Sequence, residues 1–347
     1  MRESVWGSRS EGKREGMTGD LKRVRLGRSE LMVSPIAFGT WQLGGEWGQF
    51  DEQKAIEAIR HAHGLGIDLF DTAQAYGFGV SERLLAQALE DELREARDEV
   101  VIATKGGLRP VPGGVVRDSS PEFLRDGVEK SLEALGVEYI DLYQVHWPDR
   151  DTPPAETGAA LAELRDEGKI RHIGVSNYSA AQMAELSQTA PVETLQPPYH
   201  LFAREIEDGV LPWCLDNDVG VLVYGPLAHG LLTGAIDEDT EFADDDWRSD
   251  SPQFSQGNLR QNLEVVRQLG EVADGIGCTL SQLAIAWTLR HPAVHVAIVG
   301  SRSPAHIEES VGALDVQLSD ADLQQIETVM QGAVTAPGPS PEMNSQR

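Results

Sequence analysis

The 347-residue chain has only two cysteines, Cys214 and Cys278, too few for a disulfide framework or a cysteine-rich zinc site. It also lacks an apolar run of about 18 residues, the length that a membrane-spanning helix needs. The N-terminal residues are polar and contain no hydrophobic signal-peptide segment. These absences predict a cytoplasmic protein of a reducing compartment that does not span a membrane.

Positive charge is scarce as well. Asp and Glu number 56 against 29 Lys and Arg, which gives a formal net charge of −27. Such a surface repels phosphate backbones and anionic headgroups, so we expect neither nucleic-acid nor membrane binding. Only six of the cations are lysines, and an acid-rich, lysine-poor composition is typical of an acidic proteome in a salt-rich cell interior. Full stability in dilute buffer would contradict that hypothesis.

Both ends of the chain are predicted to be loose. Residues 1–20 form a polar, mixed-charge extension, and residues 332–347 are rich in Pro, Gly and Ser. Between them, residues 21–331 contain no linker or break in composition and are expected to form a single domain. With 40% hydrophobic residues, the chain can build a sizeable core.

Short apolar runs alternate with amphipathic stretches along this domain. The expected strands are 36–40, 67–71, 100–105, 139–146, 172–175, 192–196, 219–224 and 296–299. The expected helices are 51–63, 81–92, 121–135, 155–167, 180–187, 206–215, 279–289 and 305–311. Eight strands, each followed by a helix, predict an α/β fold of the (β/α)8 TIM-barrel type. Residues 21–34 add an N-terminal β-hairpin, and residues 259–273 and 320–330 add two extra helices.

Polar residues end three neighbouring expected strands. Asp71, Lys105 and His146 occupy these ends, and Tyr76 follows Asp71 in the same loop. Because barrel enzymes carry their reacting groups at the C-terminal ends of strands, these four side chains are expected to converge. A free phenol has a pKa near ~10 and donates a proton poorly at neutral pH, but a neighbouring ammonium favours the phenolate. The set therefore predicts a proton donor beside a polarised carbonyl group.

Four longer segments carry a family resemblance: FDTAQAYGFGVSE, ATKGG, DLYQVHWPD and IGVSNYS, in this order. They resemble the aldo-keto reductases, and the resemblance extends from about residue 24 to residue 330. It implies a barrel that binds NADPH or NADH in extended form and a small-molecule carbonyl substrate, such as an aldehyde, a ketone or a sugar-derived carbonyl. The family's catalytic tetrad falls on Asp71, Tyr76, Lys105 and His146. Tyr76 is then the general acid/base, and hydride passes from nicotinamide C4 to the carbonyl carbon.

The resemblance also implies a set of cofactor-binding residues. Ser176, Asn177 and Gln196 would hold the nicotinamide carboxamide, Tyr224 would stack on its ring, and the backbone of residues 225–227 would approach the pyrophosphate. Arg302 precedes an expected helix N-terminus and can fork onto the 2′-phosphate of NADPH. His306 and Ser310 depart from the family's usual residues, which leaves NADH use open. The full set is Gly39, Thr40, Trp41, Ser176, Asn177, Gln196, Tyr224, Gly225, Pro226, Leu227, Gly300, Arg302, His306, Glu309 and Ser310.

Other interpretations stay open at this point. The same barrel serves potassium-channel β-subunits as a cofactor-binding sensor, and Lys105 could form a Schiff base in a lyase. His200 either lines the pocket or caps a turn. We expect no metal site, and the acidic run at residues 244–246 is expected to be a solvated loop rather than a calcium site. The loops at 106–116 and 234–257 are expected to shape the substrate pocket, while the oligomeric state stays undetermined.

Overall fold

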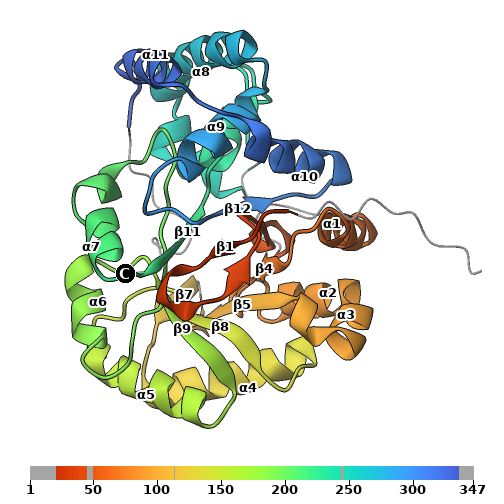
Figure 1. The fold of residues 1–347 in the computed structure, drawn as a ribbon, viewed down its shortest axis with the longest axis vertical. Coiled ribbons are helices and arrows are strands. Elements are labelled where there is room, and N and C mark those ends of the chain that lie inside the picture. Colours follow the sequence, from red (N-terminus) through yellow and green to blue (C-terminus); the bar gives the residue numbers. More distant parts are fainter. Residues whose placement is uncertain (1–20, 45–49, 113, 244–245, 336–347) are drawn as a thin grey trace, which may run out of the picture.

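The computed structural model describes residues 21–44, 50–112, 114–243 and 246–335 (Figure 1). The expected loose ends at residues 1–20 and 336–347 lie outside the described residues. In the described chain, eight parallel strands close into a barrel, as predicted from the sequence. In their order around the barrel these strands are β3 (Ile36–Gly39), β4 (Leu69–Asp71), β5 (Val101–Gly106), β8 (Ile140–Val145), β9 (Ile170–Ser176), β10 (Thr194–Gln196), β11 (Gly220–Tyr224) and β12 (Val296–Gly300).

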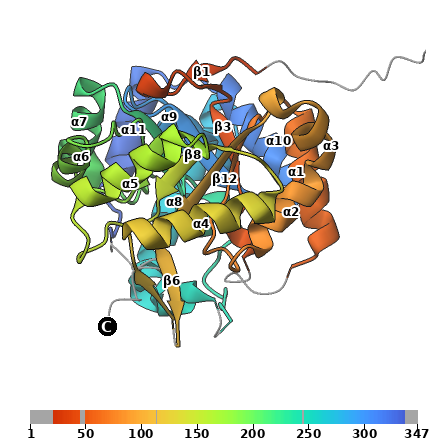
Figure 2. The same cartoon turned by 90° about the horizontal axis from the view of Figure 1, so that it is seen from below.

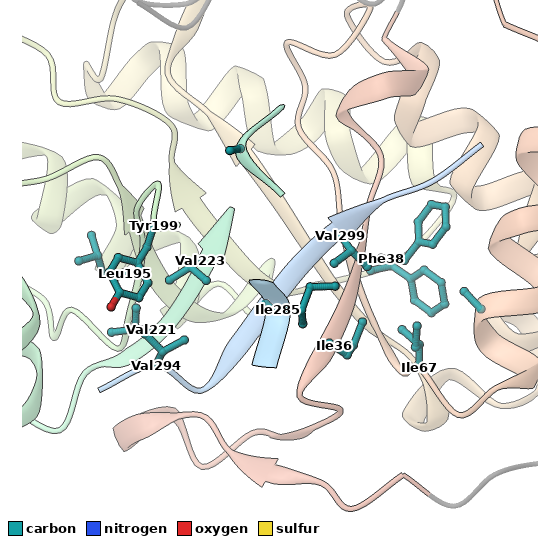
Figure 3. Packing of buried hydrophobic residues seen from close by; sticks show 14 of the residues in the cluster. Ile36, Phe38, Ile67, Leu195, Tyr199, Val221, Val223, Ile285, Val294 and Val299 are labelled. Carbon is teal, nitrogen blue, oxygen red and sulfur yellow. The ribbon is translucent and has the colours of Figure 1, made fainter. Parts of the chain in front are cut away.

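Alternation along the strands divides the core into two parts, because successive side chains of a strand point to opposite faces. Ala37, Leu69, Ala103 and Leu142 belong to a cluster inside the barrel, which the hairpin residue Leu26 closes at one end. Their neighbours, such as Phe38 and Tyr143, belong to a larger cluster between the barrel wall and the helices. Figure 3 shows part of this outer cluster. Both sides of every strand are therefore buried, which explains the nearly continuous apolar runs in the sequence.

The helices cover the outside of the barrel, and some of them, such as α1 and α9, begin at a capping side chain. Asp51 accepts hydrogen bonds from the amides of Gln53 and Lys54, and Thr279 forms a capping box with Gln282. The helices are α1 (Glu52–Gly64), α2 (Val80–Ala88), α3 (Glu90–Glu95), α4 (Pro121–Leu135), α5 (Pro154–Asp166), α6 (Ala180–Leu186), α7 (Val210–Asp216), α8 (Gln256–Ile276), α9 (Leu280–Leu289), α10 (Pro304–Val311) and α11 (Asp320–Met330).

Two expected helices are divided. The expected helix 81–92 becomes α2 and α3, which meet at Leu89, where the backbone leaves helical geometry. The expected helix 206–215 becomes a 3-10 turn, Glu205–Asp208, and the short α7 after Gly209. Glycine weakens a helix because it exposes the backbone and has much conformational freedom to lose.

Two hairpins lie at opposite ends of the barrel (Figure 2). The predicted one pairs β1 (Val24–Arg25) with β2 (Met32–Val33) and covers the N-terminal ends of the barrel strands. The second pairs β6 (Leu108–Val111) with β7 (Gly114–Arg117) at the C-terminal ends. It was expected only as a loop, because its strands are short, include Pro110 and bury little apolar surface.

The two extra helices pack against each other beside the barrel, as α8 and α11. The described residues that follow α11 contact α8. The Asn262 side chain of α8 both donates to the Val334 carbonyl at 3.1 Å and accepts from its amide at 2.8 Å. This amide pair holds the segment against α8.

Within the described residues, no single helix is long and apolar enough to cross a membrane. The helices α8 and α9 meet the criteria of length and apolar composition only when they are taken together, and they are bent by 85° at the break between them.

Gly27 offers a test of the hairpin's role in closing the barrel. Its φ is +54°, and a Cβ there would lie 2.1 Å from the Gly220 nitrogen of β11. We expect Gly27→Ala to lower the free energy of unfolding by roughly 2–4 kcal/mol, because it adds backbone strain and a clash with a rigid backbone. Urea unfolding measures the change.

The matched control is Gly270→Ala in α8, where a Cβ would meet nothing within 4 Å. This variant should be neutral or gain about 0.5–1 kcal/mol. Equal stability of Gly27→Ala and the parent would contradict the close approach between hairpin and barrel.

Candidate active site

The four candidate catalytic residues meet at the C-terminal end of the barrel. Asp71 ends β4, Lys105 lies near the end of β5, and His146 directly follows β8. The Lys105 Nζ lies 2.7 Å from Asp71 Oδ2 and 3.3 Å from the Tyr76 hydroxyl. The Tyr76 and His146 rings are 5.7 Å apart between centroids and meet edge to face at 79°. The structure therefore brings together all four side chains that the sequence singled out.

Lys105 is completely buried, so every proton of its ammonium group needs an acceptor. It donates to Asp71 Oδ2, to the Thr72 carbonyl at 2.9 Å and to the Tyr76 hydroxyl. The Asp71 carboxylate supplies the compensating charge that a buried cation requires. Because the Tyr76 oxygen accepts from Lys105, the phenol keeps its own proton for donation.

Two glutamines hold the other oxygen of Asp71. Gln196 Nε2 donates to Asp71 Oδ1 at 2.7 Å, and Gln144 Nε2 lies 3.5 Å from the same oxygen. Gln196 thus has a role beyond the predicted carboxamide contact, because it fixes the carboxylate that fixes Lys105. Sequence reasoning missed Gln144, although its place two residues before His146 on a buried strand was a usable signal.

A cavity of about 490 Å³ opens beside Tyr76 and His146. All predicted cofactor-binding residues line it except Thr40. Thr40 does not line the cavity, because its side chain points into the protein. It donates to the Asp71 carbonyl at 3.1 Å and accepts from Ser81 Oγ at 2.6 Å, and so it anchors the strand ends instead.

The Tyr224 ring forms part of the cavity wall, and hydrogen bonds fix its position. Its hydroxyl donates to Asn177 Oδ1 at 3.0 Å, and Asn177 Nδ2 donates to the His146 carbonyl at 3.1 Å. Asn177 adopts a left-handed backbone conformation, with φ at 63°, which asparagine tolerates better than most residues. A planar aromatic wall beside convergent amide and hydroxyl groups fits a nicotinamide ring.

Two arginines, Arg248 and Arg302, also line the cavity, although the chain as a whole is strongly acidic. Arg302 donates to the Gln42 carbonyl at 3.0 Å, and its guanidinium lies 5.7 Å from the Phe50 ring centroid. Burial lowers the pKa of Arg302, and the charge of Arg248 lowers it further. Two cations in a partly buried cavity fit an anionic ligand such as a cofactor phosphate.

Arg248 was missed, although it lies in the loop 234–257 that was expected to be functional. It binds Asp246 through two guanidinium nitrogens, with Nη2 to Oδ2 at 2.6 Å, and donates to the His229 carbonyl at 3.2 Å. Asp246 is therefore buried and ion-paired, which corrects its expected solvation. Residues 244 and 245 lie outside the described residues.

The predicted Trp41 belongs to an aromatic group beside Tyr76, whose other members, Trp247 and His229, were missed. Trp41 stacks on Tyr76 at 6.5 Å and on Trp247 at 6.1 Å, and His229 meets Trp247 edge to face at 4.7 Å. Burial lowers the pKa of His229 to about 4, so this cavity wall is neutral near pH 7. His200 lies behind it and accepts from the Phe202 amide at 3.2 Å, which supports the turn-capping interpretation.

The β6–β7 hairpin contacts the residues next to two catalytic candidates. Leu108 and Val115 pack with Ala75, which precedes Tyr76, and with Trp147, which follows His146. The Arg117 guanidinium lies 4.5 Å from the Trp147 ring centroid. The hairpin therefore braces the loop of Tyr76 and the loop of His146 together.

The geometry does not fit the Schiff-base interpretation. Lys105 has no exposed surface and does not line the cavity, so a substrate carbonyl cannot reach its amine. Among the described residues, no three His, Cys, Asp or Glu side chains lie close enough to hold a metal ion.

The model of the Aldo/keto reductase family matches residues 35–331. Aldo-keto reductase YhdN of Bacillus subtilis (strain 168) is 41% identical over 88% of this chain and 93% of its own length. The NADH-specific methylglyoxal reductase of Escherichia coli (strain K12) is 37% identical over 87% of this chain and 96% of its own.

Solved structures agree with the fold. The glycerol dehydrogenase AKR11B4 from Gluconobacter oxydans is 37% identical and aligns with a TM-score of 0.83 over 91% of this chain and 97% of its own. An aldo/keto reductase from Klebsiella pneumoniae, solved in complex with NADP and acetate, is 31% identical, with a TM-score of 0.70 over 91% and 97%.

The buried ion pair between Asp71 and Lys105 can be tested by removing the charge of Asp71. Asp71→Asn keeps the shape of the side chain but removes the charge opposite Lys105. We expect kcat for carbonyl reduction to fall by about 100-fold or more, because the ammonium is no longer fixed against Tyr76. Steady-state kinetics with NADPH and an aldehyde measures the loss.

The control is Asp141→Asn at the opposite end of the barrel, where the carboxylate pairs with Arg97. It should lower the free energy of unfolding, as Asp71→Asn does, but leave kcat within about threefold. Similar kcat values for the two variants would contradict a specific role for Asp71.

Proposed function

The chain belongs to the aldo/keto reductase family and is an NAD(P)H-dependent enzyme that reduces carbonyl groups, and on that premise we propose that Tyr76 is its general acid/base. The substrates in this proposal are aldehydes and ketones, including sugar-derived carbonyls, and the reaction is reversible. The observation that carries it is the 3.3 Å contact between the buried Lys105 ammonium and the Tyr76 hydroxyl.

Side chains of the protein donate the proton and stabilise the negative charge that develops during the reaction. When bound, the cofactor supplies the hydride that reduces the carbonyl carbon. Tyr76 donates its proton to the carbonyl oxygen, and Lys105 stabilises the phenolate left behind. His146, edge-on to Tyr76 at the cavity wall, positions the same oxygen. In the reverse direction the phenolate takes the proton from the alcohol.

The residues that line the cavity suit an extended dinucleotide. Tyr224 would stack on the nicotinamide, with Ser176, Asn177 and Gln196 near its carboxamide. Arg302 would bind the 2′-phosphate, which makes NADPH the preferred cofactor. The Klebsiella relative with bound NADP supports this preference. The NADH-specific Escherichia coli relative shows that this family also contains the opposite preference.

Small, oxygen-rich carbonyl compounds are the substrates that the cavity suits best. Next to Tyr76 its wall combines the Trp41 indole with the neutral imidazole of His229 and the His146 ring. Such a wall offers both an apolar surface and hydrogen-bonding groups. Two of the relatives, a methylglyoxal reductase and a glycerol dehydrogenase, act on compounds of this kind, which supports this choice.

Tyr76→Phe tests the proposed acid. The variant keeps the ring contacts with Trp41 and His146 but loses the proton that the carbonyl oxygen needs. We expect kcat to fall by at least about 1,000-fold, while the NADPH dissociation constant stays within about threefold. Turnover of an aldehyde panel and fluorescence titration with NADPH measure the two quantities. A variant that keeps its activity would overturn the assignment.

Arg302→Ala tests the cofactor preference. Loss of a guanidinium that binds the 2′-phosphate should raise the NADPH dissociation constant by about 10–100-fold and the NADH constant by less than about threefold. The control is Arg267→Ala on the exposed face of α8, which should change neither constant. Equal weakening of NADPH and NADH by Arg302→Ala would place the phosphate elsewhere.

A further inference from the structure

A second group of buried polar side chains lies on the outer side of the barrel wall, behind the site. On β5, Ala103 belongs to the cluster inside the barrel, so the next residue, Thr104, faces outward. Thr104 pairs in register with Tyr143 of β8, which also faces outward. Thr104 donates to the Glu82 carboxyl of α2 at 2.7 Å, and Glu82 is only 1% exposed.

The members of this outer group lie next to the catalytic candidates in the chain. Thr104 directly precedes Lys105, Gln74 lies two residues before Tyr76, and Tyr143 lies three residues before His146. The start of α2 is tied to the same loop, because the Ser81 amide donates to the Tyr76 carbonyl at 3.2 Å. The position of α2 therefore sets the position of Tyr76.

Close packing leaves these groups little freedom to move. A Cβ on Gly106 would lie 1.9 Å from the Tyr143 hydroxyl. A Cβ on Gly127 of α4 would lie 3.1 Å from Gln74 Oε1 and 3.2 Å from the same hydroxyl. Both glycines allow backbone and phenol to approach closely, so a shift of α2 or α4 is transmitted to the strand ends.

We propose that Glu82 is a positioning residue for carbonyl reduction, because it joins the helix that follows Tyr76 to the strand that carries Lys105. The proposal rests on the proposed roles of those two residues. Glu82 does not touch the cavity and acts only through them. The Glu82 carboxyl bonds to Thr104 on β5. The neighbouring Ser81 hydroxyl bonds to Thr40 after β3 and to Thr72 after β4. Together they attach the first turn of α2 to three adjacent strands.

Glu82 performs this role as the neutral acid. Three buried atoms of this group, Glu82 Oε2, Tyr143 OH and Gln74 Oε1, have no hydrogen-bond partner among the described residues. A carboxylate adds only acceptors to this group, whereas a carboxylic acid adds a donor. A buried carboxylate with one unsatisfied oxygen is also costly.

Burial of the Glu82 carboxyl favours this neutral state, while the cations that face it favour the carboxylate. Burial raises the pKa of Glu82, against the opposing hydroxyls of Ser131 and Thr104 and the opposing charges of Arg83 on α2 and Lys105 on β5. Tyr143 on β8 stays protonated because burial raises its pKa, and the negative charge of Asp126 on α4 adds to that effect.

Two variants of Glu82 test the proposal through activity. Glu82→Gln keeps the shape and neutrality of the side chain, so kcat should stay within about threefold of the parent enzyme. Glu82→Ala removes the attachment, so kcat should fall by at least about tenfold, while the NADPH dissociation constant stays within about threefold. Glu122→Gln on the exposed side of α4 is the control and should change neither quantity.

A folded Glu82→Ala with kcat within twofold of the parent would overturn the positioning role. A Glu82→Gln variant as impaired as Glu82→Ala would overturn the neutral acid. If Tyr76→Phe keeps its activity, the proposed function fails by itself. If Tyr76→Phe is inactive but Glu82→Ala is not, only the present inference fails.

Two measurements do not need activity and stay informative if Glu82→Ala fails to fold. The infrared carbonyl stretch of a protonated, buried carboxylic acid should be present in the parent and absent from Glu82→Gln. A carboxyl with a raised folded-state pKa stabilises the protein at low pH and loses that contribution as pH rises above its ordinary value of 4.5. Stability of Glu82→Gln relative to the parent should therefore increase from pH 4.5 to pH 7.5, and an unchanged difference would contradict the neutral acid.

Discussion

The buried ammonium of Lys105 is the interaction on which the site depends. It has three protons and three acceptors, and each acceptor comes from the segment after β4 or from the end of that strand. Burial makes the arrangement strict, because an unsatisfied charge in this position would destabilise the fold as well as the site. The buried Lys105 ammonium needs all three acceptors, and this need joins β5 to β4 in the barrel wall. The same need places the Tyr76 hydroxyl at the cavity.

The sequence was sufficient for the barrel and for the four side chains at its rim, because both follow from local patterns. Buried parallel strands give continuous apolar runs, and parallel strand ends lie side by side. The contacts between residues far apart in the chain could not be predicted from the sequence. Thr40 precedes a cavity residue but points away from the cavity, and Arg248 comes from a long excursion whose path no periodicity reveals. Gln144 and Glu82 were hidden because their partners lie on other strands and helices.

Charge is distributed unevenly over the protein, and the net charge does not show this. The chain carries −27 overall, yet Arg302 and Arg248 line the cavity. An acidic surface repels most polyanions, while a compact anion that enters the cavity can still reach the arginines. Asp246 binds Arg248 and keeps that cation ordered in the absence of a ligand anion. The loop after β11 thus contributes electrostatics as well as shape.

The brace between the β6–β7 hairpin and the residues beside Tyr76 and His146 limits how this enzyme can diversify. Loops at the rim of a barrel usually change without disturbing the scaffold, which lets related enzymes acquire new specificities. Here Leu108 and Val115 contact Ala75 and Trp147 directly, so a hairpin transplanted from a relative would disturb the reacting groups together with the substrate pocket. Exchanges that preserve this small apolar contact are the ones open to evolution and to protein engineers.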